Sequence, residues 1–151
     1  MGKGSKGMVV ADGNGLPIGL HGDSAQPHEL TLAETTLSTI RVPQPRGRPR
    51  TRPKELVADK AYDSRAFRRQ LRRRGIQPTI PSYERRKGMK PKGGRPRQVG
   101  PGYRRRWLVE RCFGWMDNCR RLVVRYDRHV HIYQAFCLVA IILWCVDRIL
   151  K

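Results

Sequence analysis

Acidic residues are scarce in this sequence. Only 12 Asp and Glu stand against 32 Lys and Arg, which gives a formal net charge of +20 over 151 residues. A charge of that size opposes compaction unless a polyanion lies against it. Nucleic-acid phosphates are the commonest such partner, so the composition favours a nucleic-acid-binding protein. A basic disordered tail is excluded, because Trp, Phe and many aliphatic residues supply material for a core.

The sequence also lacks a cysteine pattern for metal or disulfide bonding. None of its four cysteines belongs to a CxxC pair, and no His stands at zinc-finger spacing. These cysteines are Cys112, Cys119, Cys137 and Cys145. We expect reduced thiols in the core of a cytosolic protein.

No segment predicts a signal peptide or a membrane span. The glycine- and lysine-rich start is not followed by an apolar stretch. Only residues 135–146 could suggest a membrane segment, and that run is too short to span and ends at Asp147 and Arg148. A buried helix is expected there instead.

The first third of the chain predicts a hairpin and a helix. Apolar residues 8–11 and 16–20 flank the turn signal Asp12-Gly13-Asn14-Gly15, which predicts a β-hairpin with Pro17 at an edge or near a bulge. Residues 30–40 then carry apolar side chains at helical spacing.

The middle of the chain predicts a short strand–helix–strand segment between two basic loops. A buried strand is expected over 56–58, a helix over 65–74 capped at its start and closed by Gly75, and a weaker strand over 76–80. Residues 41–54 and 81–102 are rich in Pro, Gly, Lys and Arg and have no core-forming pattern. They are phosphate contacts in one interpretation and solubilising loops in the other.

Two helices are expected to close the chain, over 103–124 and 132–150, with a turn between them. The order of elements indicates a single mixed α/β domain over residues 1–151. Residues 41–128 hold 28 of the Lys and Arg but only 7 acids. Each acid there lies in a basic field and is therefore a candidate for function.

Asp59 is the first such candidate. It ends the run Leu56-Val57-Ala58, and the ends of strands in α/β folds are where functional side chains project from a rigid support. Alternatively, Asp59 caps the next helix or forms a turn with Lys60. Position alone does not separate the two interpretations.

Glu110 is the second candidate, because of its neighbours on the helix expected over 103–124. At 100° per residue, Tyr103, Arg106, Glu110 and Asp117 fall on one narrow arc. The opposite side is apolar and must be buried, with Leu108, Val109, Cys112, Trp115, Met116 and Cys119. An ordinary solvated face with an Arg106–Glu110 pair is the alternative.

These motifs resemble those of a known family. Tyr103-x2-Arg106-x3-Glu110-x6-Asp117 resembles the Y-x2-R-x3-E-x6-K signature of the DDE transposases of bacterial insertion sequences. Residues 57–63 resemble that family's second-Asp motif, and residues 12–17 and 24–29 resemble its upstream strand and loop. The segments 107–115, 120–122 and 125–128 are similar to the insertion-sequence-five type. The resemblance covers nearly the whole chain in the right order.

The resemblance implies an RNase H-like, retroviral integrase-like fold in which Asp, Asp and Glu hold two divalent metal ions, Mg²⁺ or Mn²⁺. Asp59 would be the second Asp and Glu110 the Glu, as catalytic residues and metal ligands. Carboxylate oxygens suit Mg²⁺, and two metals can stabilise both reacting oxygens of a phosphodiester displacement. The DNA-binding residues implied are Tyr103, Arg106, Arg120, Arg121 and Arg125.

The chain departs from the family pattern at two places. Asp117 stands where the signature has Lys. The first Asp lies on a strand upstream of Met1 in the family, and Asp12 resembles a turn acid rather than that ligand. We therefore expect an N-terminally truncated catalytic domain, made with an upstream-frame part or left as a truncated copy. Alone, it should bind DNA without cleaving it.

The function expected from the resemblance is DNA transposition by phosphodiester hydrolysis and strand transfer at insertion-sequence ends. The expected partners are double-stranded DNA of the terminal inverted repeats and the target, the upstream part, and further copies when active. Such a protein would be cytoplasmic and associated with the nucleoid. The alternative is a non-catalytic basic DNA- or RNA-binding protein, or an inactive transposase remnant.

Overall fold

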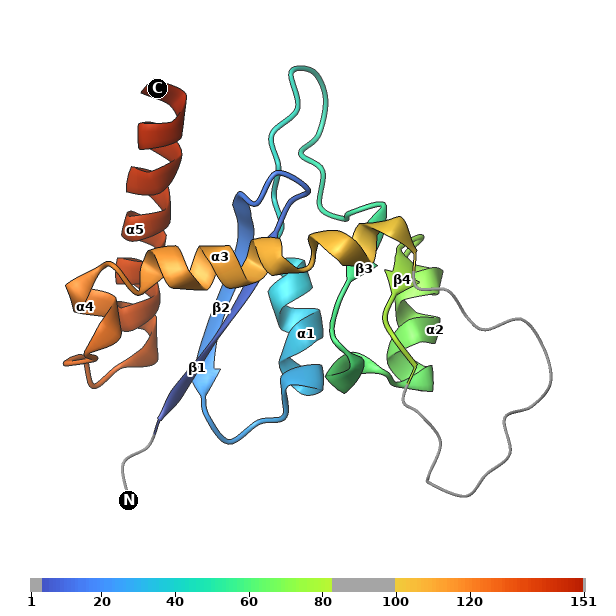
Figure 1. Ribbon diagram of the computed structural model, residues 1–151, viewed down its shortest axis with the longest axis horizontal. Helices are drawn as coiled ribbons and strands as arrows, with labels where there is room; N and C mark the ends of the chain where they lie inside the picture. The colour runs from blue at the N-terminus through green and yellow to red at the C-terminus, as the bar shows by residue number, and fades with distance from the viewer. Residues whose placement is uncertain (1–3, 83–99, 151) are drawn as a thin grey trace. The chain divides into compact units, whose positions relative to one another are not determined.

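The computed structural model describes residues 4–82 and 100–150, and its elements follow the mixed α/β order that the sequence predicts (Figure 1). The chain divides into two compact units. One consists of Met1–Arg52 and Trp107–Lys151, and the other of Pro53–Arg106.

The first unit is built on the predicted hairpin. Strand β1 (Ser5–Ala11) pairs antiparallel with β2 (Pro17–Ser24). The Asp12 carboxylate accepts the Asn14 and Leu16 amides, both at 2.8 Å, and Gly15 has a φ of 83°, which favours glycine. The register shifts at Ala11, which lies opposite Pro17, so the predicted irregularity at this proline is confirmed.

Helices cover both faces of the hairpin. Helix α1 (Glu29–Ser38) packs on one face, where Gly19 lies against Thr39. Helix α5 (Val130–Leu150) packs on the other face, where Gly22 lies against Val130. Successive strand residues point to opposite faces, so β2 contributes to two apolar layers. The layer under α5 consists of Leu20, Met116, Leu122, Cys137, Ala140 and Ile141.

The second unit is the predicted strand–helix–strand segment. Strand β3 (Glu55–Val57) and strand β4 (Gln77–Thr79) pair in parallel, with the 3₁₀ turn η1 (Lys60–Tyr62) and helix α2 (Arg65–Arg73) between them. Ser64 caps α2 by accepting the Phe67 amide, which confirms the predicted helix start. Within the described ranges the strands thus form two two-stranded sheets, where the sequence suggested one short mixed sheet.

The single helix expected over 103–124 is wrong. The structure has a 3₁₀ turn η2 (Pro101–Arg105), helix α3 (Trp107–Met116) and a short helix α4 (Arg120–Val123). An unbroken helix would turn Leu122 by roughly 80° from the direction of Cys112. The break between α3 and α4 instead lets Leu122 join the core under α5. The expected burial of the apolar side of α3 is confirmed in part, since Cys112 and Met116 are buried, whereas Leu108, Val109 and Trp115 are half-buried.

The expectation of a buried helix over 135–146 is only partly right. Helix α5 has 21 residues, and only Cys137, Ala140, Ile141 and Trp144 are buried. Among the described residues it is the one helix whose length and composition would suffice to cross a membrane, so the segment is longer than the sequence suggested. An all-round apolar pattern predicts burial, but this unit supplies partners for only one side of the helix.

Of the two basic loops, only the first lies entirely within the described residues. Residues 41–54 are largely exposed, as predicted, with a single β-bridge between Val42 and Arg50. Of the second basic loop, residues 83–99 lie outside the described ranges.

Candidate catalytic site

Asp59 lies at the carboxyl end of β3, in the second unit. It is the N-cap residue of η1, yet within the described chain its side chain makes no capping hydrogen bond. The side-chain capping alternative is therefore wrong, whereas the alternative of a turn with Lys60 is confirmed, because the Tyr62 amide donates to Asp59 O at 2.9 Å. About half of the side chain, 49%, is exposed, so the carboxylate is open to solvent at the end of a parallel strand pair.

Arg106 is the partner of this carboxylate. Its guanidinium donates to Asp59 Oδ1 across 47 residues of sequence, and its Cζ lies 5.8 Å from the centre of the Tyr103 ring. The structure thus brings together three residues that the sequence singled out. A guanidinium beside a carboxylate keeps a fixed positive charge where a phosphate could approach.

Glu55 is a residue of this site that the sequence analysis did not single out. Its carboxylate accepts the Thr79 hydroxyl, which ties β3 to β4. The same carboxylate lies against Gly102 of η2, where a Cβ would come within 3.0 Å of Glu55 Oε2. Glu55 therefore anchors the segment that leads to Arg106. The available signal was an acid at a strand start and the Gly-Pro-Gly run at 100–102.

Glu110 lies in the first turn of α3 and is exposed. It belongs to the first unit, whereas Tyr103, Arg106 and Asp59 belong to the second. The expected column of Tyr103, Arg106, Glu110 and Asp117 along one continuous helix is wrong, because a 3₁₀ turn carries Tyr103 and α3 ends before Asp117. The pairing of Asp59 with Glu110 in one metal site stays a prediction.

The side chains of Asp59 and Glu110 are of the chemical type that binds a hard divalent cation. Asp59 and Glu110 both offer carboxylate oxygens on exposed side chains, which Mg²⁺ and Mn²⁺ prefer. No cluster of three or more His, Cys, Asp or Glu side chains that could hold a metal occurs within residues 4–82 and 100–150. A complete two-metal site needs at least one further ligand.

Comparison with known proteins identifies the family. The sequence profile described as "Transposase DDE domain" matches residues 2–145. The chain belongs to the DDE transposase family. A similar protein is the "Putative transposase for insertion sequence element IS402" of Burkholderia cepacia, which is 34% identical over 144 residues. That match covers 94% of this chain and 63% of the relative, so the chain spans less than two thirds of the relative's length. No solved structure matches significantly.

The family assignment confirms the resemblance inferred from the motifs. DDE transposases are enzymes of DNA transposition, they bind DNA, and they generally use divalent metal ions. The assignment thus accounts for the strongly basic composition. Because the family generally uses divalent metal ions, the carboxylates of Asp59 and Glu110 are candidate metal ligands.

Two of the arginines expected to bind DNA in this transposase domain make side-chain contacts within the first unit. Arg121 pairs with Asp127 at 2.9 Å, and its Cζ lies 4.7 Å from the Phe136 ring centre. Arg125 donates to the backbone carbonyl oxygens of Asp127 and Arg128 at 2.8 and 3.1 Å. Both side chains hold the turn between α4 and α5. Their contact with DNA, like that of the exposed Arg120, stays a prediction.

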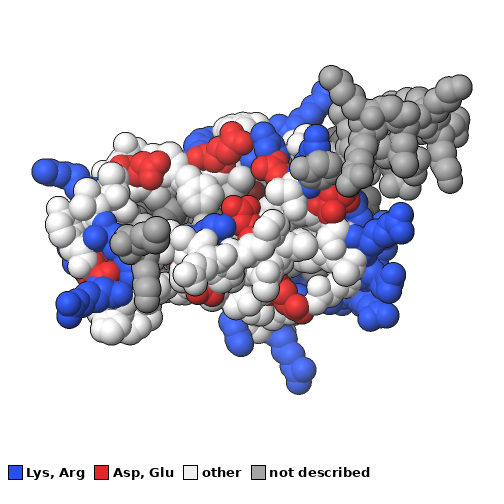
Figure 2. Space-filling view, turned by 90° about the horizontal axis from the view of Figure 1, so that it is seen from below, with Lys and Arg blue, Asp and Glu red and all other residues white. Residues whose placement is uncertain are grey.

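Helix α2 carries a further basic surface that the sequence analysis did not assign to DNA. Phe67 and Leu71 are buried, and the opposite side presents exposed arginines. These are Arg65, Arg69, Arg72 and Arg73. Figure 2 shows Lys and Arg side chains gathered over this part of the second unit. The signal in the sequence was the run Arg68-Arg69-x-x-Arg72-Arg73-Arg74.

Proposed function

We propose that this chain is the C-terminal part of the catalytic domain of an insertion-sequence transposase. The reaction would be hydrolysis of DNA phosphodiesters at the element's ends, followed by strand transfer to target DNA. The observation that carries the proposal is Asp59, whose exposed carboxylate stands at a strand end with Arg106 bound to it. Family membership supports the same assignment.

Asp59 and Glu110 are proposed as metal ligands. Bound Mg²⁺ or Mn²⁺ supplies a Lewis acid for the reacting phosphate oxygens. Arg106 holds the Asp59 side chain in place and can instead donate to a DNA phosphate, for which its planar fork is suited. The Tyr103 ring beside the guanidinium limits the directions in which Arg106 can turn.

The third carboxylate is proposed to come from a segment that precedes β1 in a longer protein. The relative in Burkholderia cepacia extends well beyond the region matched by this chain. Strand β1 pairs only with β2 among the described strands, so its other edge can accept a further strand. A strand added there, carrying the first Asp, fits the proposed RNase H-like fold.

Plasmid nicking tests the proposal. A supercoiled plasmid carrying the element's ends is incubated with Mg²⁺ or Mn²⁺ and either the 151-residue chain or its fusion to the upstream frame. We expect the fusion to nick and the shorter chain only to bind. In the fusion, Asp59→Asn and Glu110→Gln should each abolish nicking, while DNA affinity changes by less than about twofold.

A matched control is Glu34→Gln, which removes an exposed carboxylate from α1. This variant of the fusion should nick at the wild-type rate. Nicking that survives Asp59→Asn would refute the ligand assignment. Nicking by the 151-residue chain alone would mean that all three ligands lie within it, with Asp12 the leading candidate.

A non-catalytic DNA-binding protein or an inactive remnant is the second candidate. It is favoured by the lack of a three-ligand group within residues 4–82 and 100–150. The same assay separates the two candidates. A folded fusion that binds the element's ends and never nicks, with either metal ion, supports the inactive form.

A further inference from the structure

Helix α5 exposes a continuous apolar surface. Six of its apolar side chains form what we call the α5 seam: Ile132, Phe136, Val139, Leu143, Val146 and Leu150. Their exposed fractions run from 37% at Ile132 and Phe136 to 63% at Leu143 and 80% at Leu150. Ile142 and Ile149 widen the same side and are 59% and 80% exposed. An exposed apolar surface of this extent marks an interaction site.

The seam has the spacing of a coiled coil. Its members follow one another at intervals of 4, 3, 4, 3 and 4 residues, so they lie within an arc of roughly 80° along the whole helix. A seven-residue repeat of this kind serves contact with another helix that runs alongside. The remaining apolar face, with Cys137, Ala140, Ile141 and Trp144, already packs in the core of its own unit.

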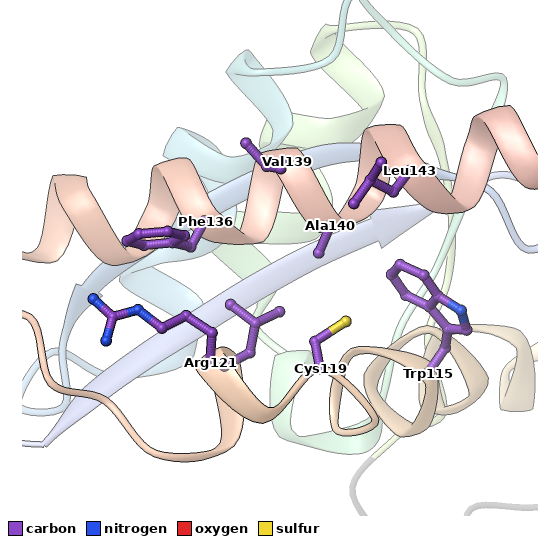
Figure 3. Close-up of a pocket in the computed structure, with 8 residues that line it drawn as sticks. Trp115, Cys119, Arg121, Phe136, Val139, Ala140 and Leu143 are labelled. Carbon is purple, nitrogen blue, oxygen red and sulfur yellow. The ribbon is translucent and has the colours of Figure 1, made fainter.

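A groove runs beside the seam. Phe136, Val139 and Leu143 form one wall, and Trp115 and Cys119 from α3 and the following turn line the other side (Figure 3). The cavity measures about 230 Å³ and is lined almost entirely by apolar atoms. Its open side gives the seam room for side chains of a second helix.

We propose that the α5 seam binds the α5 seam of a second copy of this chain, with the two helices antiparallel. In that arrangement Phe136 faces Val146 of the other copy and Val139 faces Leu143. Ile132 then faces Leu150. Each layer pairs a β-branched side chain with Leu or Phe, so the surface is complementary to itself across a two-fold axis.

The charge at the two ends of α5 favours the antiparallel direction. Helix α4 and the turn after it carry Arg120, Arg121, Arg125 and Arg128 against the single acid Asp127. A parallel pair would bring two such turns together, and like charges repel. In the antiparallel pair each basic turn lies near the C-terminus of the other helix, where the backbone dipole is negative and positive charge is lower, with Asp147 against Arg148 and Lys151.

The packing of α5 argues against a lipid bilayer as the partner that covers the α5 seam. Cys137 and Ile141 belong to the same core layer as Leu20 of β2, and Gln134 accepts the Gly22 amide at 3.4 Å. A helix that spanned a membrane would have to leave the hairpin and expose that core to water. A second α5 covers the seam without this loss.

The test is the mass of the 151-residue chain in solution, measured by light scattering and sedimentation in about 1 M salt, where the Debye length is about 3 Å. High salt removes association bridged by nucleic acid and leaves apolar contacts. We expect a dimer at tens of micromolar. Val139→Glu and Leu143→Lys should each weaken self-association by at least about tenfold, because each places a charge in an apolar layer.

Two further measurements make the test specific. Val123→Glu changes an exposed valine of α4 that lies off the seam, and it should leave the dimer intact. A mixture of the Val139→Glu and Leu143→Lys chains should form a heterodimer, since the antiparallel pair places residue 139 of one copy against residue 143 of the other. A parallel pair gives no such rescue.

The outcomes that overturn the proposal are distinct. A wild-type chain that stays monomeric at tens of micromolar refutes it. Flotation of the chain with phosphatidylcholine vesicles, abolished by Val139→Glu, would assign the seam to a membrane. Dimers that tolerate both seam variants, confirmed as folded by circular dichroism, would place the interface elsewhere.

Discussion

The Asp59 carboxylate stands where β3 gives way to a helical turn, a position that often serves only to cap the turn. Here Arg106, which is distant in the sequence, donates a hydrogen bond to the carboxylate. Glu55 anchors the segment that leads to this arginine. The ion pair is 38% and 49% exposed, so it contributes little to folding stability. Little free energy is therefore lost when Arg106 leaves Asp59, which suits the metal and phosphate binding proposed for this site.

The first residue-scale prediction concerns this exchange. Arg106→Gln removes a positive charge that competes with a divalent cation for Asp59. We expect Mn²⁺ to bind about two- to fivefold more tightly, as follows from the strength of partly exposed ion pairs. Electron paramagnetic resonance of free Mn²⁺ in a titration measures the change. Arg105→Gln lowers the net charge equally from a neighbouring exposed position and serves as control. Equal effects in both variants would show that only net charge matters.

The second residue-scale prediction concerns alkaline stability. Burial raises the pKa of the Cys112 thiol, which is fully buried and donates to Gly15 O at 3.2 Å. Below pH about 8.5 the thiol is protonated in folded and unfolded chains alike, so its contribution is fully present. As the pH rises further, only the unfolded chain loses the proton, and the free energy of unfolding falls by up to about 1.4 kcal/mol per pH unit.

Urea unfolding from pH 7 to 10.5 measures this dependence. Cys112→Ala should be less stable at pH 7 and should lose less stability with rising pH than the wild type. Val9→Ala perturbs the same unit and keeps every thiol, so it should retain the wild-type slope. An unchanged slope in Cys112→Ala would contradict the assignment of this effect to Cys112.

Among the elements, the turn between α4 and α5 illustrates how a basic motif serves structure. Arg125 donates to two carbonyl oxygens of the turn and lies 5.7 Å from the centre of the Tyr133 ring. Tyr133 in turn donates its hydroxyl to Leu122 O at 3.1 Å. These contacts fix the direction in which α5 leaves the turn. The arginine run therefore positions the helix whether or not it also meets DNA.

We predict different consequences for two arginines of this motif. Arg125→Ala should lower the free energy of unfolding by about 1–2 kcal/mol, because two backbone carbonyls lose a charged donor. Arg120→Ala should change it by less than about 0.5 kcal/mol, because its side chain is exposed and has no hydrogen bond or ion pair within the described ranges. Denaturant unfolding measures both. A destabilised Arg120→Ala, or an unaffected Arg125→Ala, would refute this division.

At the scale of the whole molecule, charge governs behaviour more than any single contact. Most of the +20 charge lies between residues 41 and 128, in basic loops and on the exposed side of α2. Such a distribution binds polyanions through displaced counterions, with little dependence on base sequence. The isolated chain is therefore expected to bind duplex DNA whether or not its catalytic site is complete.

The corresponding prediction is a steep dependence of DNA affinity on salt, measured by fluorescence anisotropy. Replacing Arg69 and Arg72 of α2 by Gln should make the slope of log K against log salt shallower by about 2, roughly 0.9 for each phosphate that is no longer neutralised. A Lys6→Gln/Arg148→Gln variant removes the same charge elsewhere and should keep the slope. An affinity that hardly changes with salt would exclude phosphate binding as the main source of affinity.

Sequence by itself determined the features that depend on near neighbours. The Asp12–Gly15 turn, the Ser64 cap and the irregularity at Pro17 follow from interactions within a few residues, so local chemistry was sufficient to predict them. The motif around Asp59 likewise indicated the family before any geometry was available. The partners of charged side chains could not be predicted in this way.

Only the tertiary structure decided which group each arginine meets and which helix face is covered. Arg106 reaches a carboxylate 47 residues away, and Arg125 meets backbone carbonyls rather than solvent. Helix α3 ends at Met116, and the break after it lets Leu122 join the core under α5. The α5 seam stays exposed because a single helix has more apolar surface than its own unit can cover. These outcomes depend on surfaces brought together from distant parts of the chain, which no local pattern specifies.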